Sequence, residues 1–200
     1  RDLHSFPTRR SSDLGALPYY MDGFGNPSSL YEKGEESKAA LDKARDRVAK
    51  LINSNPSEVF FTSCGSEADN WALFGVADAL KEKGNHIITT AIEHHAILHT
   101  GEFLEKHGYE MTYLPVLPDG SVDPAVFEAA ITDKTILASV MYVNNEIGTV
   151  QPIKELAEIA HKHGVVFHTD AVQALGNVDC DVKNLDVDLM SMSEIGRAHV

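Results

Sequence analysis

Short apolar runs alternate with amphipathic stretches along most of this chain. The runs are rich in β-branched and aromatic residues, as in buried strands, and the stretches between them repeat their apolar residues every three or four positions, as in helices. Strands that alternate with helices form βαβ units around a parallel sheet covered on both faces. The pattern therefore predicts an α/β fold, a three-layer sandwich with a mostly parallel sheet.

The predicted elements follow from these periods. Strands are expected at residues 59–63, 86–92, 109–116, 136–143, 165–169 and 187–193. Helices are expected at residues 28–52, at 66–83, before a helix end near residue 108, from Asp123 onward and at 152–164. Asp123 with Pro124 directly after it is typical of a helix N-cap and first helical position.

Composition limits the class of protein. The chain has 200 residues, 43% of them hydrophobic, which suits one domain with a sizeable core. It has 17 basic and 30 acidic residues, a net charge of −13, which argues against nucleic acid or an anionic membrane as partner. No apolar run approaches the roughly 20 residues of a bilayer span, and no signal peptide is recognisable, so we expect a cytoplasmic protein. Two cysteines, Cys64 and Cys180, make a disulfide framework unexpected.

Both ends of the chain change character abruptly. Residues 1–14 are basic and serine-rich in an acidic chain, and residues 194–200 interrupt a strand pattern. We expect both segments to be non-native tails that resemble translated adapter or vector sequence. For residues 1–14, a disordered native tail is an equal alternative. The credible domain is then 15–193.

The residues that follow each predicted strand are the most informative, because ligands of parallel sheets bind at the carboxyl ends of the strands. After residues 59–63, small residues lead into a helix near Ser66, whose N-terminus suits a phosphate, although capping alone also explains such a turn. Polar side chains follow three other strands: Glu93, His94, His95, Asn144, Asn145, Asp170 and Gln173. Turn formation or capping explains each of them singly. Together they suit one ligand that has an anionic and a flat, polar part.

A metal site is not expected. His95 and His99 are four residues apart and share one helix face, but the spacing offers no third ligand.

Four segments carry a resemblance to a known family. "FTSCGSEADN", "IEHHAIL", "VNNEIGTVQPI" and "FHTDAVQALG", in this order and spacing, resemble the class V aminotransferase enzymes that use pyridoxal 5′-phosphate, and most of all the cysteine desulfurases. "FGNPSSLY" near the start is also similar to a segment of that family. The resemblance covers about residues 16–193. It implies an incomplete large domain of the aspartate-aminotransferase-like fold, truncated at both ends.

The resemblance also implies a role for each matching residue. Gly65, Ser66 and Ser193 match phosphate ligands, although the family often has threonine where Ser66 stands. His94 matches the catalytic imidazole that stacks on the cofactor ring and moves protons of the substrate. Asn145 matches an amide near the ring oxygen and the substrate carboxylate. Asp170 matches the carboxylate that keeps the ring nitrogen protonated, and Gln173 matches the side chain that binds the ring 3-oxygen.

Two family residues have no counterpart here. In the family, the last strand leads to a histidine and to the lysine that holds the cofactor, where this chain has Glu194, Ile195 and Gly196. The substrate arginine and the persulfide-forming cysteine lie in a part of the family that does not match, and neither Cys64 nor Cys180 corresponds to that cysteine. We therefore expect the chain as written to be inactive.

For the parent enzyme, the resemblance implies removal of sulfur from L-cysteine to give L-alanine and an enzyme persulfide. It also implies a sulfur-acceptor scaffold protein of iron–sulfur cluster assembly, and a homodimer. The alternatives are another class V enzyme, such as a selenocysteine lyase or small aminotransferase, and a non-catalytic cofactor-binding or interaction fragment.

Overall fold

The computed structural model describes residues 17–21 and 23–193. The predicted tails, 1–14 and 194–200, lie outside the described residues. The chain divides into two compact units, one that ends at Phe61 and another that spans Thr62–Ser193. All the predicted site residues belong to the second unit.

The first unit is built on the long helix α2, Glu32–Leu51, which begins four residues after the predicted start. Its buried residues Val48 and Ala49 lie near its C-terminal end, in the helix that packs against the short 3-10 helix η1, Pro56–Glu58. Arg45 on α2 donates from Nε to the carbonyl oxygen of Val59 over 3.1 Å.

The strand predicted at residues 59–63 is wrong. These residues form no strand, and Phe60 and Phe61 are 68% and 47% exposed. Their β-branched and aromatic composition favours extended backbone, but a strand also needs a neighbouring strand to pair with. The carbonyl oxygen of Val59 is instead bonded by the Arg45 side chain.

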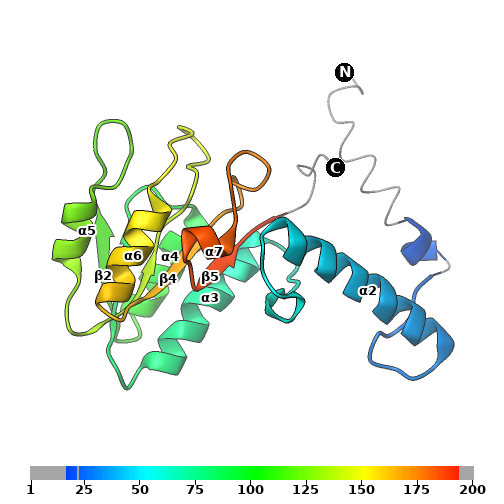
Figure 1. Cartoon of the computed structure of the whole chain (residues 1–200). Coiled ribbons are helices and arrows are strands. Elements are labelled where there is room, and N and C mark those ends of the chain that lie inside the picture. The colour runs from blue at the N-terminus through cyan, green and yellow to red at the C-terminus, as the bar shows by residue number, and fades with distance from the viewer. Residues whose placement is uncertain (1–16, 22, 194–200) are drawn as a thin grey trace, which may run out of the picture. The chain divides into compact units, whose positions relative to one another are not determined.

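The second unit contains one sheet of five strands, all paired in parallel (Figure 1). The strands are β1 (His86–Thr90), β2 (Glu110–Leu114), β3 (Thr135–Ser139), β4 (Val166–Asp170) and β5 (Leu189–Ser191). Their order across the sheet is β2-β1-β3-β4-β5. Each strand lies within its predicted range or extends one residue beyond it, so the prediction of a mostly parallel sheet is confirmed.

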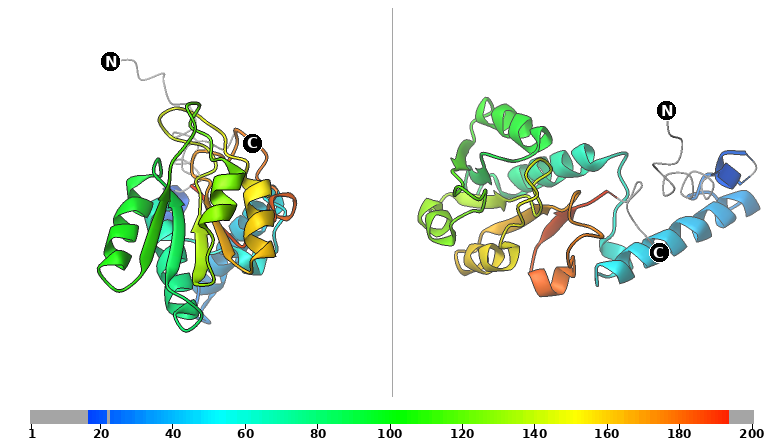
Figure 2. Two further views of the ribbon diagram at one scale, coloured as in Figure 1. Left: turned by 90° about the vertical axis from the view of Figure 1, so that its left-hand side faces the viewer. Right: turned by 90° about the horizontal axis from the view of Figure 1, so that it is seen from above.

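Helices cover both faces of this sheet (Figure 2). The helices α3 (Gly65–Leu80) and α4 (His95–Glu105) pack together on one face, and α5 (Pro124–Ala130) and α6 (Ile153–Lys162) pack together on the other. Asp123 caps α5 as predicted, because its side chain accepts from the N–H of Ala125. The three-layer α/β fold is therefore confirmed.

Each face of the sheet has its own packed layer. A buried cluster joins α3 and α4 to the strands through Leu73, Ala77, Ile87, Ile97, Leu104, Ile136 and Leu137. Beneath α5, the rings of Phe127 and Phe167 meet edge to face with centroids 6.3 Å apart, and both side chains are fully buried. Within the described residues, no helix is long and apolar enough to cross a membrane.

One short helix was not predicted. The helix α7, Val182–Leu185, is a single turn before β5. Asp181 caps it by accepting from the N–H groups of Lys183 and Asn184, and Asp186 ends it in the left-handed conformation. A single turn is too short to show a helical period in the sequence.

The strand order places a topological switch point between β1 and β3. From β1 the chain passes through α4 to β2 at one edge, and from β3 it passes through α6 to β4 on the other side. The turns after β1 and β3 therefore leave the sheet toward opposite faces, and a crevice opens between them. Binding sites of α/β proteins form at this position.

Candidate active site

The predicted site residues lie at the carboxyl edge of the sheet or in the turns that follow it. Gly65 and Ser66 open α3, and His94 is the N-cap of α4. Asp170 ends β4, and Gln173 follows it in the next turn. Asn145 occupies an exposed turn after β3, and Ser193 is half-buried two residues after β5.

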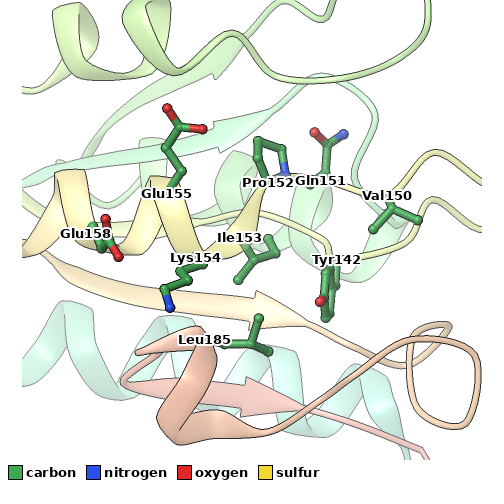
Figure 3. Close-up of a pocket in the computed structure, with 9 residues that line it drawn as sticks. All are labelled: Tyr142, Val150, Gln151, Pro152, Ile153, Lys154, Glu155, Glu158 and Leu185. Atoms are coloured by element: carbon green, nitrogen blue, oxygen red, sulfur yellow. The ribbon is translucent and has the colours of Figure 1, made fainter.

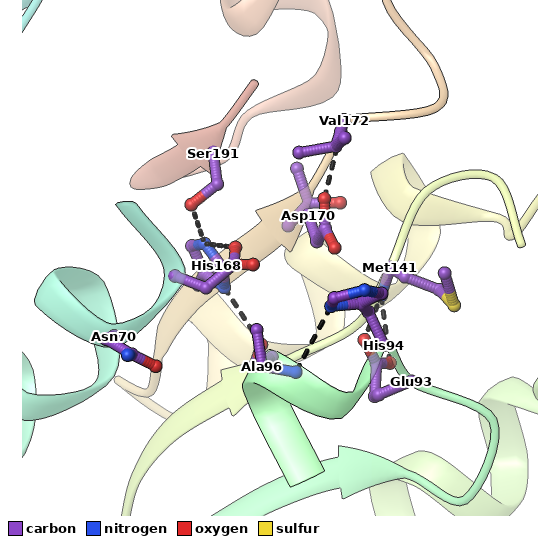
Figure 4. Close-up of polar contacts among 12 residues, drawn as sticks. Asn70, Glu93, His94, Ala96, Met141, His168, Asp170, Val172 and Ser191 are labelled. Carbon is purple, nitrogen blue, oxygen red and sulfur yellow. Dashed lines mark hydrogen bonds and ion pairs between the residues drawn. The ribbon is translucent and has the colours of Figure 1, made fainter. Parts of the chain in front are cut away.

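The structure brings three of these residues together. The carboxylate of Asp170 faces the ring of His94 (Figure 4), and the imidazole lowers the pKa of this carboxyl. The turn after Asp170 closes on Gly65, because a Cβ atom at residue 65 would lie 2.8 Å from Cγ2 of Val172. For Asn145 and Ser193, the described part of the chain shows no hydrogen bond to these three residues.

The N-terminus of α3 is suited to an anion. Its N-cap, Cys64, is extended and, among the described residues, makes no side-chain cap hydrogen bond. The first helical bond runs from the N–H of Ala68 to the carbonyl oxygen of Cys64. The N–H groups of the first turn, including those of Gly65 and Ser66, precede this bond and have no carbonyl within the helix to donate to.

The position of His94 fixes the proton of its ring. The Nδ1 atom accepts a hydrogen bond of 3.1 Å from the backbone N–H of Ala96. A backbone N–H can only donate, so Nδ1 must present a lone pair. The neutral imidazole therefore carries its proton on Nε2.

Asp170 is the buried acid at the centre of this edge. Only 5% of its surface is exposed, and its Oδ1 accepts from the N–H of Val172 over 2.9 Å. Burial raises the pKa of the carboxyl, and the Val172 amide and the His94 ring act in the opposite direction. A buried carboxylate held by one amide is suited to a cationic donor.

A layer of polar residues lies beneath Asp170 and was not predicted from the sequence. His168, fully buried on β4, bonds the hydroxyl of Ser139 over 2.9 Å and that of Ser191 over 3.0 Å. Burial lowers the pKa of His168 to about 3, so the ring is neutral. Its approach of 3.9 Å to Asp69 Oδ1 is therefore no ion pair.

Asp69 is an acid inside the apolar layer. It lies on α3, one turn before Leu73 and two turns before Ala77, on the buried face of the helix. Burial, followed by repulsion from Asp170, raises its pKa to about 7. Among the described residues, Asp69 Oδ1 is one of two buried side-chain atoms without a hydrogen-bond partner. A carboxylate on an apolar helix face is the sequence signal that could have identified it.

Glu93 is the third buried acid. Burial raises its pKa to about 8, against the effect of bonds from the Met141 N–H and the Thr90 hydroxyl. Asp170 and Asp69 each raise it further. Three carboxyl groups thus repel one another under a single edge of the sheet, and a bound cation there would relieve that repulsion.

We expect the free energy of unfolding of the cofactor-free chain to fall as the pH rises from about 5 to about 8. The pKa values of Asp69 and Glu93, about 7 and about 8, lie above those of unfolded acids, so the folded chain binds more protons in this range. Stability is then greatest at the acidic end and decreases by up to about 1.4 kcal/mol per pH unit for each such proton.

Urea unfolding across this pH range measures the slope. Glu93→Gln removes one of these protons and should flatten it, whereas the same change at the exposed Glu102 should leave it as in the wild type. A Glu93→Gln chain with the wild-type slope would contradict the assignment.

A separate groove of about 540 Å³ lies between the turn after β3, α6 and α7 (Figure 3). Its lining is Tyr142, Val150, Gln151, Pro152, Ile153, Lys154, Glu155, Glu158 and Leu185. None of the predicted site residues lines it, and the polar groups described above are also absent from that lining. On α4, the rings of His95 and His99 stack with centroids 5.4 Å apart, and the described residues offer no cluster of three metal ligands.

Known proteins resemble this chain in sequence and in structure. Cysteine desulfurase IscS of Clostridium botulinum is 59% identical over 88% of the chain, and cysteine desulfurase IscS of Methanosarcina thermophila is 53% identical over 94%. The chain spans 45% and 46% of the length of these two relatives. A solved structure described as SspA in complex with cysteine superposes with a TM-score of 0.90, at 37% identity, over 94% of this chain and 54% of that one.

The family itself is defined by a longer match. The model of the class V aminotransferases matches residues 15–194, nearly the whole chain. It includes every strand of the sheet and every predicted site residue. This chain belongs to the class V aminotransferase family.

Proposed function

We propose that this chain forms the part of a cysteine desulfurase that binds pyridoxal 5′-phosphate. The observation that carries the proposal is the carboxyl edge of the sheet, where buried Asp170 faces His94 beside the N-terminus of α3. The names of the two similar relatives support it. Because the chain spans less than half of those relatives, the activity of the whole protein is part of the proposal.

The residues present fit this cofactor. The cradle between α3 and the turn after β4 is so close that a Cβ at Gly65 would fill it, and the N–H groups of Gly65 and Ser66 would hold a phosphate there. Asp170 would bind the ring nitrogen, and its repulsion with Asp69 and Glu93 favours a cation in that place. Gln173 would bind the ring 3-oxygen, and Ser193 would be a further phosphate ligand.

Two side chains would act on the substrate. When bound, pyridoxal phosphate supplies an electron sink for negative charge that develops on the α-carbon of an amino acid. His94 would exchange a proton at Nε2, because the N–H of Ala96 occupies Nδ1. Asn145, exposed in the turn after β3, would orient the substrate carboxylate by donating from its amide.

The proposed substrate is L-cysteine, and the products are L-alanine and a persulfide on a cysteine thiolate of the enzyme. The printed title of the similar SspA structure, which names cysteine, supports this choice. A sulfur-acceptor scaffold protein of iron–sulfur cluster assembly, a homodimer and a cytoplasmic location belong to the same proposal. Cys64 and Cys180 are not assigned as the persulfide-forming residue.

The cofactor site can be tested with one pair of glycines on α3. A Cβ at Gly65 would meet Val172 at 2.8 Å, whereas a Cβ at Gly75 would meet nothing within 4 Å. We expect Gly65→Ala to weaken the binding of pyridoxal phosphate about tenfold, the equivalent of about 1.4 kcal/mol of crowding in the cradle. Gly75→Ala should bind like the wild type.

Equilibrium dialysis against pyridoxal phosphate measures both affinities. Because alanine favours a helix over glycine, Gly75→Ala should also be at least as stable as the wild type. Equal affinities of the two variants, or binding by the wild type no tighter than by an unfolded chain, would refute the proposed site.

A further inference from the structure

Two buried side chains tie the turn after β1 to the turn after β3, in opposite directions. The carboxylate of Glu93 accepts from the backbone N–H of Met141, at 2.9 Å to Oε1 and 3.1 Å to Oε2. The amide of Asn144 donates from Nδ2 to the carbonyl oxygen of Ile92 over 2.9 Å. Each turn thus contributes one side chain and one backbone group to the other (Figure 4, for Glu93 and Met141).

Both side chains are held firmly. The hydroxyl of Thr90 also donates to Glu93 Oε1 over 2.7 Å, and the residue is 5% exposed. Asn144 is 6% exposed, and its Oδ1 accepts from the N–H groups of Glu146 and Ile147. Asn144 therefore both shapes its own turn and reaches across to the neighbouring one.

These bonds cross the switch point of the sheet. The turns after β1 and β3 leave toward opposite faces, so no ladder of backbone hydrogen bonds holds them together beyond the strand ends. Glu93 immediately precedes His94, and Asn144 immediately precedes Asn145. A shift of either tie would therefore move one of the two residues proposed to contact the substrate.

We propose that Glu93 and Asn144 are positioning residues, a reciprocal clasp that holds His94 and Asn145 at a fixed separation across the crevice. This inference rests on the proposed function for the role of His94 and Asn145, although the clasp can be measured without cofactor. Turn formation accounts for Oδ1 of Asn144, but not for its Nδ2 bond to Ile92. A purely structural tie also gives no reason to bury a carboxyl group at Glu93 next to two other acids.

Gln151 provides a matched control on the same connection. It is 2% exposed, its Oε1 accepts from the N–H of Val122, and its Nε2 donates to the carbonyl oxygen of Gly120. Asn144→Asp and Gln151→Glu therefore make the same change, because each keeps the acceptor and turns a buried amide donor into an oxygen that faces a carbonyl. Only Asn144 adjoins a proposed site residue.

The first readout is the N-cap of α4 in the 200-residue chain without cofactor. The hydrogen exchange of the Ala96 amide, which His94 Nδ1 holds, reports the position of the His94 ring, as do the ring signals in NMR spectra. We expect Asn144→Asp to lower the protection of this amide about tenfold and to shift the ring signals. Gln151→Glu should do neither, even where its urea midpoint falls equally.

The second readout is the affinity for pyridoxal phosphate, which Asn144→Asp should lower about tenfold and Gln151→Glu less than about twofold. Glu93 supplies a conservative rescue: Glu93→Gln keeps Oε1 as acceptor for Thr90 and Met141 and should retain the Ala96 protection that Glu93→Ala loses. Equal effects of Asn144→Asp and Gln151→Glu on the Ala96 amide, or none in either, would overturn the clasp. A wild-type chain that does not bind pyridoxal phosphate refutes the proposed function, while the Ala96 amide still decides on the clasp.

Discussion

Replacing Asp170 with asparagine should weaken the binding of pyridoxal phosphate about 100-fold and at the same time stabilise the cofactor-free chain. Asparagine keeps Oδ1 as the acceptor for the N–H of Val172, so the local backbone stays in place. It loses the charge that would pair with the ring nitrogen, and a buried hydrogen bond to a charged group contributes about 1.5–3 kcal/mol. The loss of this charge also ends the repulsion that raises the pKa values of Asp69 and Glu93.

Asp123 is the matched control for this variant. Its Oδ1 also accepts a 2.9 Å bond from the N–H two residues further on, that of Ala125. Asp123→Asn repeats the chemical change at a helix cap, where asparagine and aspartate serve equally well. Dialysis and urea unfolding near pH 8 should show no change for this control, whereas Asp170→Asn binds less and unfolds at higher urea. An Asp170→Asn chain that loses stability together with affinity would indicate that Asp170 is mainly a structural acid.

The opposite signs of these two effects describe how the site is built. Three carboxyl groups, one of them fully buried, destabilise the folded chain above about pH 5, because each must lose a proton inside the protein. A cation at Asp170 would reverse that effect. Binding of pyridoxal phosphate should therefore stabilise the chain more near pH 8 than near pH 5.

The fold could be predicted because its signals are local. Period-two and period-four apolar patterns indicated five of the strands and the helices that flank them, and Asp123 indicated a cap. The error at residues 59–63 arose where a local pattern lacks a partner: Phe60 and Phe61 favour a strand by composition, but no neighbouring strand pairs with them. The helix α7 depends on the Asp181 cap rather than on a period.

The site could be predicted only at its surface. Asp170 and His94 follow predicted strands, so the topology alone brought them to one edge. Glu93, Asp69 and His168 act through distant partners, such as the Met141 amide and the Ser139 hydroxyl, which are far away in the sequence. Register and helix packing decide those contacts, and neither can be inferred from the spacing of residues in one sequence.

Phe167 should produce the largest loss of stability of any side chain considered above. It lies in the centre of β4, is fully buried, and meets Phe127 edge to face at an interplanar angle of 85°. Phe167→Ala removes a whole ring from a close-packed layer, and the cavity adds to the lost burial, so we expect a cost of about 3–5 kcal/mol. The same change at Phe60, which is 68% exposed, should cost less than about 0.5 kcal/mol.

The same strand then distinguishes stability from binding. Side chains alternate along β4, so Phe167 packs beneath α5 while His168 and Asp170 lie on the face toward α3. Phe167→Ala should therefore unfold at much lower urea, yet its folded fraction should bind pyridoxal phosphate within about threefold of the wild type. Asp170→Asn, three residues away, should show the reverse. Dialysis at a urea-free concentration where Phe167→Ala remains folded by circular dichroism measures this difference, and a 100-fold loss of affinity in both variants would show that packing on the α5 face, not the charge at Asp170, governs the site.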